Sequence, residues 1–456
     1  MTSSMNQRTV DPTEGPLFRK IMIYALPIMA TGLLQLMFNA ADLVVVGRFC
    51  GSNSVAAVGA TGSLTSLLVN FFLGMSVGVG VSSAHALGAR NDELTSKTVH
   101  TAVPAALIFG LIMSSLGLIF SPTLLELMGT PEDVIGLSAT YMRIYFLGMP
   151  GSMLCNFGIA ILRAAGDTKS PLIYLTLSGV VNVILNVIFV VFFHMDVAGV
   201  ALATLISGTL SAILVTLTLM RRTDGCRLML RKIRIYKAQM VKIFTIGVPA
   251  GIQSSLFAIS NVLIQSSINS FGSAAMAGNS AGASIDGFLS TTLDAFSQTA
   301  MNFTGLCVGA HRHDRLNKIL STCLGCIISF GLPLGILLYS FSEPLLSIYI
   351  TASAEAIHYG TTRMMLMTTL WFLGGIQSAM SGILRGMGRS VIPMVVSILG
   401  VCVFRVVWIF TIFQIPQFHT FAWLMGSYPI SWFLTFLAQF LCYLKIRRKE
   451  EVPAVA

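Results

Sequence analysis

Polar side chains form one stripe along the first long apolar segment of the chain. Thr31, Gln35, Asn39 and Asp42 follow one another at steps of four, four and three residues, which places them on one face of a helix. Asp42 precedes Leu-Val-Val-Val and so lies inside the apolar run, where an ionised carboxylate is costly unless it is paired, hydrated or protonated. Such an acid either reaches the outer interface or forms a structural salt bridge, or it binds a proton or a cation. We favour the binding of a proton or a cation, because intramembrane acids are rarely retained without a transport pathway.

A second polar stripe lies in the apolar segment 170–193. Ser178, Asn182 and Asn186 are spaced at i, i+4 and i+8, and Thr204 lies in the next apolar segment. Buried asparagines can simply hydrogen-bond between helices, or their amide oxygens can bind a cation. If the first half of the chain is one bundle, these side chains could converge with Asp42.

The second half of the chain carries its acids elsewhere, and the position that corresponds to Asp42 is Ile264. Its polar side chains fall on two expected helices, with Gln253, Asn261 and Gln265 over 241–269, and Asp286, Ser290 and Asp294 over 274–309. The two acids share a helix face, so they could share a cation or a proton, or one could pair with Arg363 or Arg405. Trp408, one turn beyond Arg405, could stack on its guanidinium group or on an aromatic substrate.

The composition indicates a membrane protein. Of 456 residues, 55% are hydrophobic and 10% are charged, and the mean hydropathy is +0.81, whereas a soluble domain is about one quarter charged. Apolar runs of roughly 20 residues without alternation indicate helices rather than a barrel. We therefore predict an all-α integral membrane protein with twelve transmembrane helices. They are expected at residues 20–47, 53–86, 98–121, 136–161, 170–193, 197–220, 241–269, 274–309, 316–342, 356–383, 390–414 and 420–445.

The two halves of the chain repeat each other. Pro27 and Asn39 lie 222 positions before Pro249 and Asn261, and the segment ILRAAGDTKSP lies 222 positions before ILRGMGRSVIP. Several matches at one offset indicate a duplicated unit. Each half holds an even number of expected helices, so we predict two six-helix bundles in the same orientation, related as a parallel internal repeat.

Basic residues are unevenly distributed among the loops. Of the 28 Lys and Arg residues, 24 lie in the two termini and in alternate loops, and eight of these lie in the segment 221–242. This is the positive-inside pattern, and it places both termini in the cytoplasm. It also accounts for the net charge of +10 without nucleic acid as a partner.

These patterns divide the chain into five parts: a cytoplasmic tail over 1–19, a first lobe over 20–220, a basic cytoplasmic linker over 221–240, a second lobe over 241–445 and a tail over 446–456. Apolar residues interleave with Arg and Lys in the linker, namely Leu228, Leu230, Ile233 and Ile235. This pattern is compatible with a short amphipathic helix on the inner leaflet.

The sequence contains neither a phosphate-binding GxxxxGK[ST] loop nor an HExxH motif. We therefore do not expect an enzyme, ATP hydrolysis within this chain or a cofactor.

Almost the whole chain, roughly residues 15–445, resembles the multidrug and toxic compound extrusion (MATE) transporters. The resemblance is carried by LPIMATGLLQLMFNAADLVVVGRF, LGARND, GIAILRAAGDTKSPL, NVILNVIFV, VAGVALATLIS and ILRGMGRSVIP. It is closer to the bacterial DinF-like branch. That branch has a cation site whose motif positions match Asp42, Asn182, Asn186 and Thr204. At Asn186 the branch commonly has Asp, so this chain retains one titratable group where the pattern supplies two.

The resemblance implies a secondary antiporter of the bacterial cytoplasmic membrane. It would export organic cations, often aromatic drugs, by alternating access in exchange for H⁺ or Na⁺, as a monomer. Pro27 and Pro249 should kink the first helix of each half. Candidate substrate or second-site residues are Gln35, Asn39, Gln253, Asn261, Gln265, Asp286, Asp294 and Arg405. A flippase for lipid-linked precursors or polysaccharides is the alternative, because related two-lobed folds move such substrates.

Overall fold

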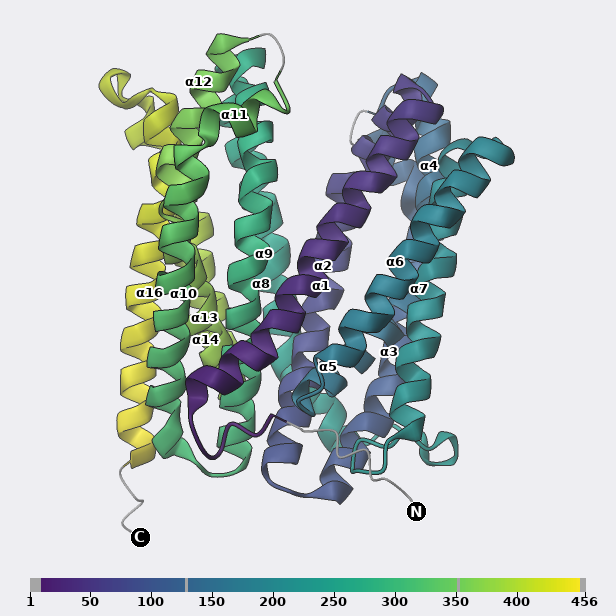
Figure 1. Ribbon diagram of the computed structural model, residues 1–456, viewed down its shortest axis with the longest axis vertical. Coiled ribbons are helices and arrows are strands. Elements are labelled where there is room, and N and C mark those ends of the chain that lie inside the picture. The colour runs from purple at the N-terminus through teal and green to yellow at the C-terminus, as the bar shows by residue number, and fades with distance from the viewer. Residues whose placement is uncertain (1–9, 128–129, 351–352, 452–456) are drawn as a thin grey trace. The chain divides into compact units, whose positions relative to one another are not determined.

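The computed structural model describes residues 10–127, 130–350 and 353–451 (Figure 1). Within these ranges the regular structure is helical. The α-helices are α1 (Leu17–Phe49), α2 (Ser52–Gly88), α3 (Asp92–Leu127), α4 (Glu132–Leu147), α5 (Met149–Ala164), α6 (Lys169–Val187), α7 (Asp196–Arg221), α8 (Lys237–Asn269), α9 (Ser273–Gly309), α10 (Leu316–Ser340), α11 (Ser342–Ser347), α12 (Ala354–Arg363), α13 (Trp371–Gly386), α14 (Val391–Ser397), α15 (Phe404–Phe410) and α16 (Phe421–Glu451). Short 3₁₀ turns are η2 (Leu230–Lys232), η3 (His313–Arg315), η6 (Ile412–Gln414) and η7 (Pro416–Phe418).

Three of the predicted membrane-spanning segments contain a stretch of π-helix. These stretches are η1 (Ile188–Phe192) after α6, η4 (Met364–Thr368) between α12 and α13, and η5 (Ile398–Val403) between α14 and α15. A π-helical turn inserts an extra residue into the helical ladder and is frequent at functional sites. Each of the three lies within two residues of a buried polar side chain in a span: Asn186, Arg363 and Arg405.

Among the described residues, nine helices are long and apolar enough to cross a membrane, and a tenth span is possible if the pair α4 and α5 is counted as one. That pair bends by 47° at Gly148, where we had predicted one continuous helix over 136–161. Pro150 explains the break, because it lacks an N–H group and its ring clashes with the preceding turn. The helix α9 and the broken helix α12–α13 are not among the ten, and α9 includes several polar residues, Asn279, Asp286 and Asp294 among them.

The chain separates into two compact units. The first consists mainly of Leu26–Gly251, and the second of Ile252–Val308 and Arg312–Ala456 together with Glu14–Ala25. Helices α1 and α8 are therefore each divided between the two units. The first part of α1 and the last part of α8 belong to the second unit.

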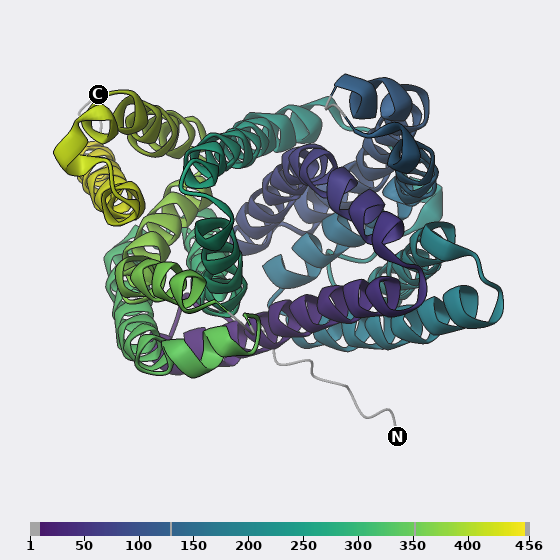
Figure 2. The same cartoon turned by 90° about the horizontal axis from the view of Figure 1, so that it is seen from above.

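Close helix contacts shape the first unit. Gly110 of α3 meets the backbone of Pro150 at the start of α5, so a side chain at position 110 would clash with that backbone. Helices α6 and α7 lie side by side, as both views show (Figures 1 and 2). This arrangement brings the polar stripe of α6 next to α7.

The linker between α7 and α8 is a strap on α3 and contains no amphipathic helix. Over residues 222–236 its one regular element is the short η2 turn, so the expected helix is not formed. Cys226 and Leu228 are buried against α3, and the Met229 N–H donates to Nε2 of His100 at 3.0 Å. Leu228 is thus withdrawn into the protein core, which removes one member of the apolar face that an amphipathic helix would need.

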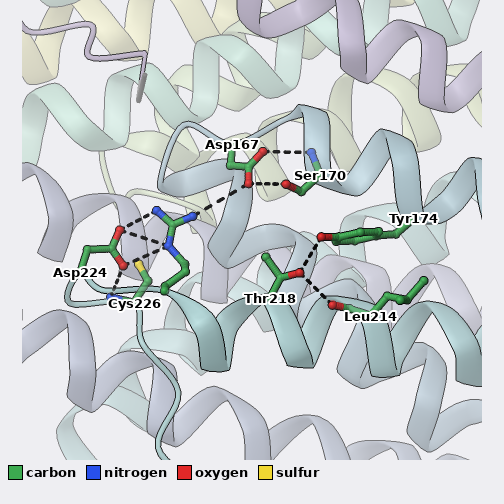
Figure 3. A network of polar contacts seen from close by, with 8 residues as sticks. Asp167, Ser170, Tyr174, Leu214, Thr218, Asp224 and Cys226 are labelled. Carbon is green, nitrogen blue, oxygen red and sulfur yellow. Dashed lines mark hydrogen bonds and ion pairs between the residues drawn. The ribbon is translucent and has the colours of Figure 1, made fainter. Parts of the chain in front are cut away.

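Arg222 anchors the strap to the turn before α6. Its Nε and Nη2 atoms donate to Asp224 at 3.0 and 2.5 Å, and its Nη1 lies 4.0 Å from Asp167 (Figure 3). Asp167 in turn accepts from the N–H and the hydroxyl of Ser170. One guanidinium group therefore joins the turn before α6 to the end of α7.

This network predicts a pH-dependent contribution to stability. Partial burial alone would raise the pKa of Asp224, but the hydrogen bonds and positive charge of Arg222 outweigh it and lower the pKa below the ordinary value of 3.8. A lowered pKa stabilises the folded state above the unfolded-state pKa, and this stabilisation is lost as pH falls through the folded pKa. We expect Asp224→Asn to lower the stability at neutral pH by about 1 kcal/mol. The difference from wild type should shrink on acidification toward pH ~3, as measured by thermal unfolding in detergent. A difference that stays constant with pH would contradict this account.

Candidate functional site

Four of the predicted site residues meet inside the first unit. Asn186 of α6 donates from Nδ2 to Oδ1 of Asp42 on α1 at 2.5 Å, and to Oδ1 of Asn182 at 3.2 Å. Asn182 donates from Nδ2 to the hydroxyl of Thr204 on α7 at 3.5 Å. Three helices thus place one carboxylate, two amides and one hydroxyl in a single cluster, which we call the Asp42 cluster.

The Asp42 cluster is rich in oxygen atoms. Asn186 is fully buried, and its Oδ1 has no hydrogen-bond donor among the described residues. If the amide of Asn182 is turned over, its nitrogen lies 2.8 Å from Oδ1 of Asp42. Because an amide presents a donor on one side and an acceptor on the other, both asparagines can turn either group toward the carboxylate. The cluster can therefore stabilise an ionised Asp42 with N–H donors, or offer oxygens to a bound proton or cation.

Ser207 belongs to the same cluster and was not predicted from the sequence. It accepts from Nδ2 of Asn182 at 3.3 Å and lies three residues after Thr204, on the same face of α7. The i, i+3 spacing was the available signal. Among the described residues, no group of three His, Cys, Asp or Glu side chains could hold a metal ion.

The remaining residues of the α1 stripe lie outside the cluster. Gln35 and Asn39 are exposed side chains with no recorded hydrogen bond in the described part of the chain, whereas Thr31 is buried and donates to the Pro27 carbonyl at 2.7 Å. Pro27 and Pro249 lie inside continuous helices, so their effect as kinks stays a prediction.

The second unit holds a buried ion pair. Nε and Nη2 of Arg363 donate to Oδ2 of Asp286 at 3.1 and 2.8 Å, and the hydroxyl of Thr368 donates to the other oxygen at 2.5 Å. Nη1 of Arg363 donates to Oδ1 of Asn279 at 2.6 Å, and Asn279 donates to Gln265 at 3.1 Å. Both carboxylate oxygens of Asp286 are therefore occupied by donors of the protein itself.

Three other candidates in the second unit do not join this network. Asn261 and Asp294 are exposed, so Asp286 and Asp294 form no joint site in this structure. Gln253 is buried and accepts from Nη2 of Arg385 at 2.7 Å. The acidic stripe of the sequence thus consists of one paired and one exposed acid.

Arg405 is buried among aromatic side chains of α16. Its guanidinium carbon lies 3.9 Å from the ring centre of Tyr428 and 5.8 Å from that of Trp432, and its Nε donates to Ser431 at 3.0 Å. Trp408, the aromatic neighbour expected from the sequence, instead donates to the carbonyl of Trp423 at 3.2 Å. The stacking partners come from α16 because they are distant in sequence and near in space.

Together these features define a multi-pass membrane protein built from a duplicated half, with buried polar clusters inside its helix bundles. This is the architecture of many secondary transporters.

Comparison with known proteins identifies the family. The family model described as MatE matches residues 27–188 and 249–411, two segments that begin 222 residues apart. The chain therefore belongs to the MATE family of multidrug efflux transporters, and the repeat seen in the sequence corresponds to one match in each half. The predicted all-α fold with twelve transmembrane helices in two bundles is confirmed.

Curated relatives cover most of the chain. A probable multidrug resistance protein, YoeA of Bacillus subtilis, is 28% identical over 454 residues and covers 97% of each chain. A probable multidrug resistance protein, NorM of Thermotoga maritima, is 25% identical and covers 88% of this chain and 87% of its own length. A FAD transporter of Shewanella oneidensis is 26% identical and covers 74% of this chain and 75% of its own length.

Solved structures share the fold. A MOP superfamily transporter of Pyrococcus furiosus, described as having a binding pocket of reverse polarity, superimposes with a TM-score of 0.89 at 19% identity and covers 98% of this chain and 99% of its own. The Vibrio cholerae MATE transporter VcmN in its bent form gives 0.86 at 20% identity, with 95% and 98% covered.

Proposed function

We propose that this protein is a secondary antiporter that exports organic cations or aromatic drugs in exchange for H⁺ or Na⁺, with the Asp42 cluster as the coupling site. The observation that carries the proposal is the position of Asn186. One side of its buried amide donates to Asp42, and the other side ends in an oxygen without a donor. A buried oxygen without a partner is unfavourable unless another state of the protein provides one.

The proposed coupling step is a change of charge at Asp42. In the outward-facing state the carboxylate takes up a proton or a sodium ion and is neutralised. Asn186 and Asn182 then present their amide oxygens in place of their N–H groups, and α1 repacks against α6. This movement expels the substrate outward, and release of the ion to the cytoplasm resets the cycle. Each charge that enters gains about 2.3 kcal/mol per 100 mV, in addition to the concentration term.

Both ions fit the chemistry of the cluster. Sodium prefers hard oxygen ligands, as does Ca²⁺. The cluster offers such ligands: the carboxylate of Asp42, the amide oxygens of Asn182 and Asn186, and the hydroxyl of Thr204. A proton needs one titratable group, which Asp42 provides. Because Asn186 cannot titrate, we propose that the site carries one proton or one sodium ion per cycle.

Asp286 of the second lobe is not a coupling acid in this proposal. Asp286 is held by Arg363 and Thr368, and a carboxylate that already has a cationic partner gains little from another cation. We also propose that the protein acts as a monomer in a bacterial cytoplasmic membrane. The distribution of Lys and Arg supports a location of both termini in the cytoplasm.

The experiment that tests the proposal is efflux of a fluorescent organic cation from proteoliposomes. A pH gradient and a sodium gradient are imposed separately on vesicles that contain the full chain. We expect substrate movement under one of the two gradients and none in protein-free vesicles, which names the ion. An absence of flux under both gradients would contradict antiport of such cations, and lipid-linked substrates would then be tested for the flippase alternative.

A further inference from the structure

Arg363 and Arg405, two of the buried arginines in the second unit, have very different partners. Arg363 and Arg405 are 6% and 4% exposed. Arg363 faces the carboxylate of Asp286, whereas Arg405 has no carboxylate partner among the described residues. An uncompensated charge in such a position is costly, and intramembrane arginines that persist usually serve a pathway or a ligand.

The contacts of Arg405 leave one edge of its guanidinium group unused. Nε donates to Ser431, and the ring of Tyr428 covers one face of the group. Nη2 is buried and has no acceptor within the described chain. The two terminal nitrogens form the fork that binds carboxylate or phosphate groups through two parallel hydrogen bonds.

The surroundings of this edge are aromatic. Trp432 lies one turn after Tyr428 on α16, and its ring packs edge-on against Trp371 with centres 5.2 Å apart. Aromatic faces of this kind bind planar ring systems, while the guanidinium supplies the charge. The π-helix η5 ends two residues before Arg405, and Gly400 within it packs against Thr435 of α16.

A purely structural role does not account for these features. The bond to Ser431 and the stacking on Tyr428 tie α15 to α16, but an uncharged side chain could form such a tie without burying an unsatisfied donor. The buried N–H groups of Nη2 have no acceptor within the described chain.

We propose that Arg405, with Tyr428 and Trp432, is a recognition site for the oxyanion of an aromatic substrate, either a carboxylate or a phosphate. The substrates would then include aromatic anions and zwitterions, and would not be limited to simple cations. This inference rests on the proposed transport function and deepens it by naming a substrate class. The substrate would reach the site as the second lobe opens during the transport cycle.

The test compares two dyes that differ in one group, a rhodamine with a free carboxylate and its methyl ester. Binding to the purified full chain in detergent is measured by fluorescence anisotropy without any ion gradient. We expect the wild type to bind the free carboxylate about tenfold more tightly than the ester. Arg405→Gln should bind the two dyes equally, and Arg405→Lys should keep only part of the preference because lysine lacks the planar fork. Arg389→Gln, which changes an exposed arginine, should behave as wild type.

Several results would overturn the proposal. Equal affinity of the wild type for both dyes would do so, and this measurement does not depend on the folding of a variant. A preference that survives unchanged in folded Arg405→Gln or Arg405→Lys would do so as well. Displacement of the acid dye from wild type by phosphatidylglycerol, but not by phosphatidylcholine, would assign the site to a lipid headgroup. Because no gradient is used, failure of ion coupling at Asp42 would leave these results unchanged.

Discussion

Replacing Asp42 with asparagine is expected to abolish gradient-driven efflux while leaving the protein folded. The carboxylate is the only titratable group of the Asp42 cluster among the described residues, so the variant cannot change its charge when an ion arrives. Asparagine has nearly the same shape and can still accept from Nδ2 of Asn186. The free energy of unfolding should therefore change by no more than about 1 kcal/mol.

The measurement is dye efflux from proteoliposomes under whichever gradient drives the wild type. The rate of Asp42→Asn should fall to that of protein-free vesicles, while its elution profile and thermal unfolding match wild type. Asp314→Asn is the matched control, because that carboxylate is exposed at a turn and paired with Arg312 at 2.9 Å. Coupled efflux by Asp42→Asn at the wild-type rate would remove Asp42 from the mechanism.

Helix periodicity made the Asp42 cluster accessible to prediction from the sequence. The steps of three and four residues placed Asp42, Asn182 and Asn186 on defined helix faces, and the family resemblance added Thr204. The structure brings these four residues together. The twelve helices followed in the same way from the length of the apolar runs. Periodicity fixes which side of a helix is polar, but it does not fix which neighbouring helix lies beside each turn of that side. Asn39 and Gln35 lie three and seven residues before Asp42 along α1, and at their level the side chains are exposed outside the cluster.

Contacts between distant helices were less predictable. The sequence left open whether Asp286 shares an ion with Asp294 or pairs with an arginine, because that choice depends on the position of α12 relative to α9. The aromatic partners of Arg405 lie 23 and 27 residues away on α16, so local spacing pointed to Trp408 instead. The linker was misjudged for a related reason. Its amphipathic pattern is real, but His100 and the core beneath α3 compete for the same backbone and for Leu228.

The ion pair of Asp286 and Arg363 is expected to be the most sensitive point of the second unit. Asp286 is 1% exposed, and Arg363→Met would leave its charge without a partner. Loss of one member of a buried pair costs about 3–5 kcal/mol, because the desolvation of the other charge is no longer compensated. Replacement of both by apolar residues of similar volume, Asp286→Leu with Arg363→Met, should cost much less than either single change.

Unfolding of the purified wild type, the two single variants and the double variant in detergent forms a double-mutant cycle that measures this coupling. Strictly additive losses would show that the pair contributes no interaction energy, contrary to its geometry. The same double variant also separates the roles of the two lobes. If Asp286 is a structural ion-pair partner and the coupling site lies at Asp42, the folded double variant should still carry out gradient-driven efflux. If efflux stops although the protein is folded, the second lobe takes part in coupling, and the charge of Arg363 must then be displaced from Asp286 during the cycle.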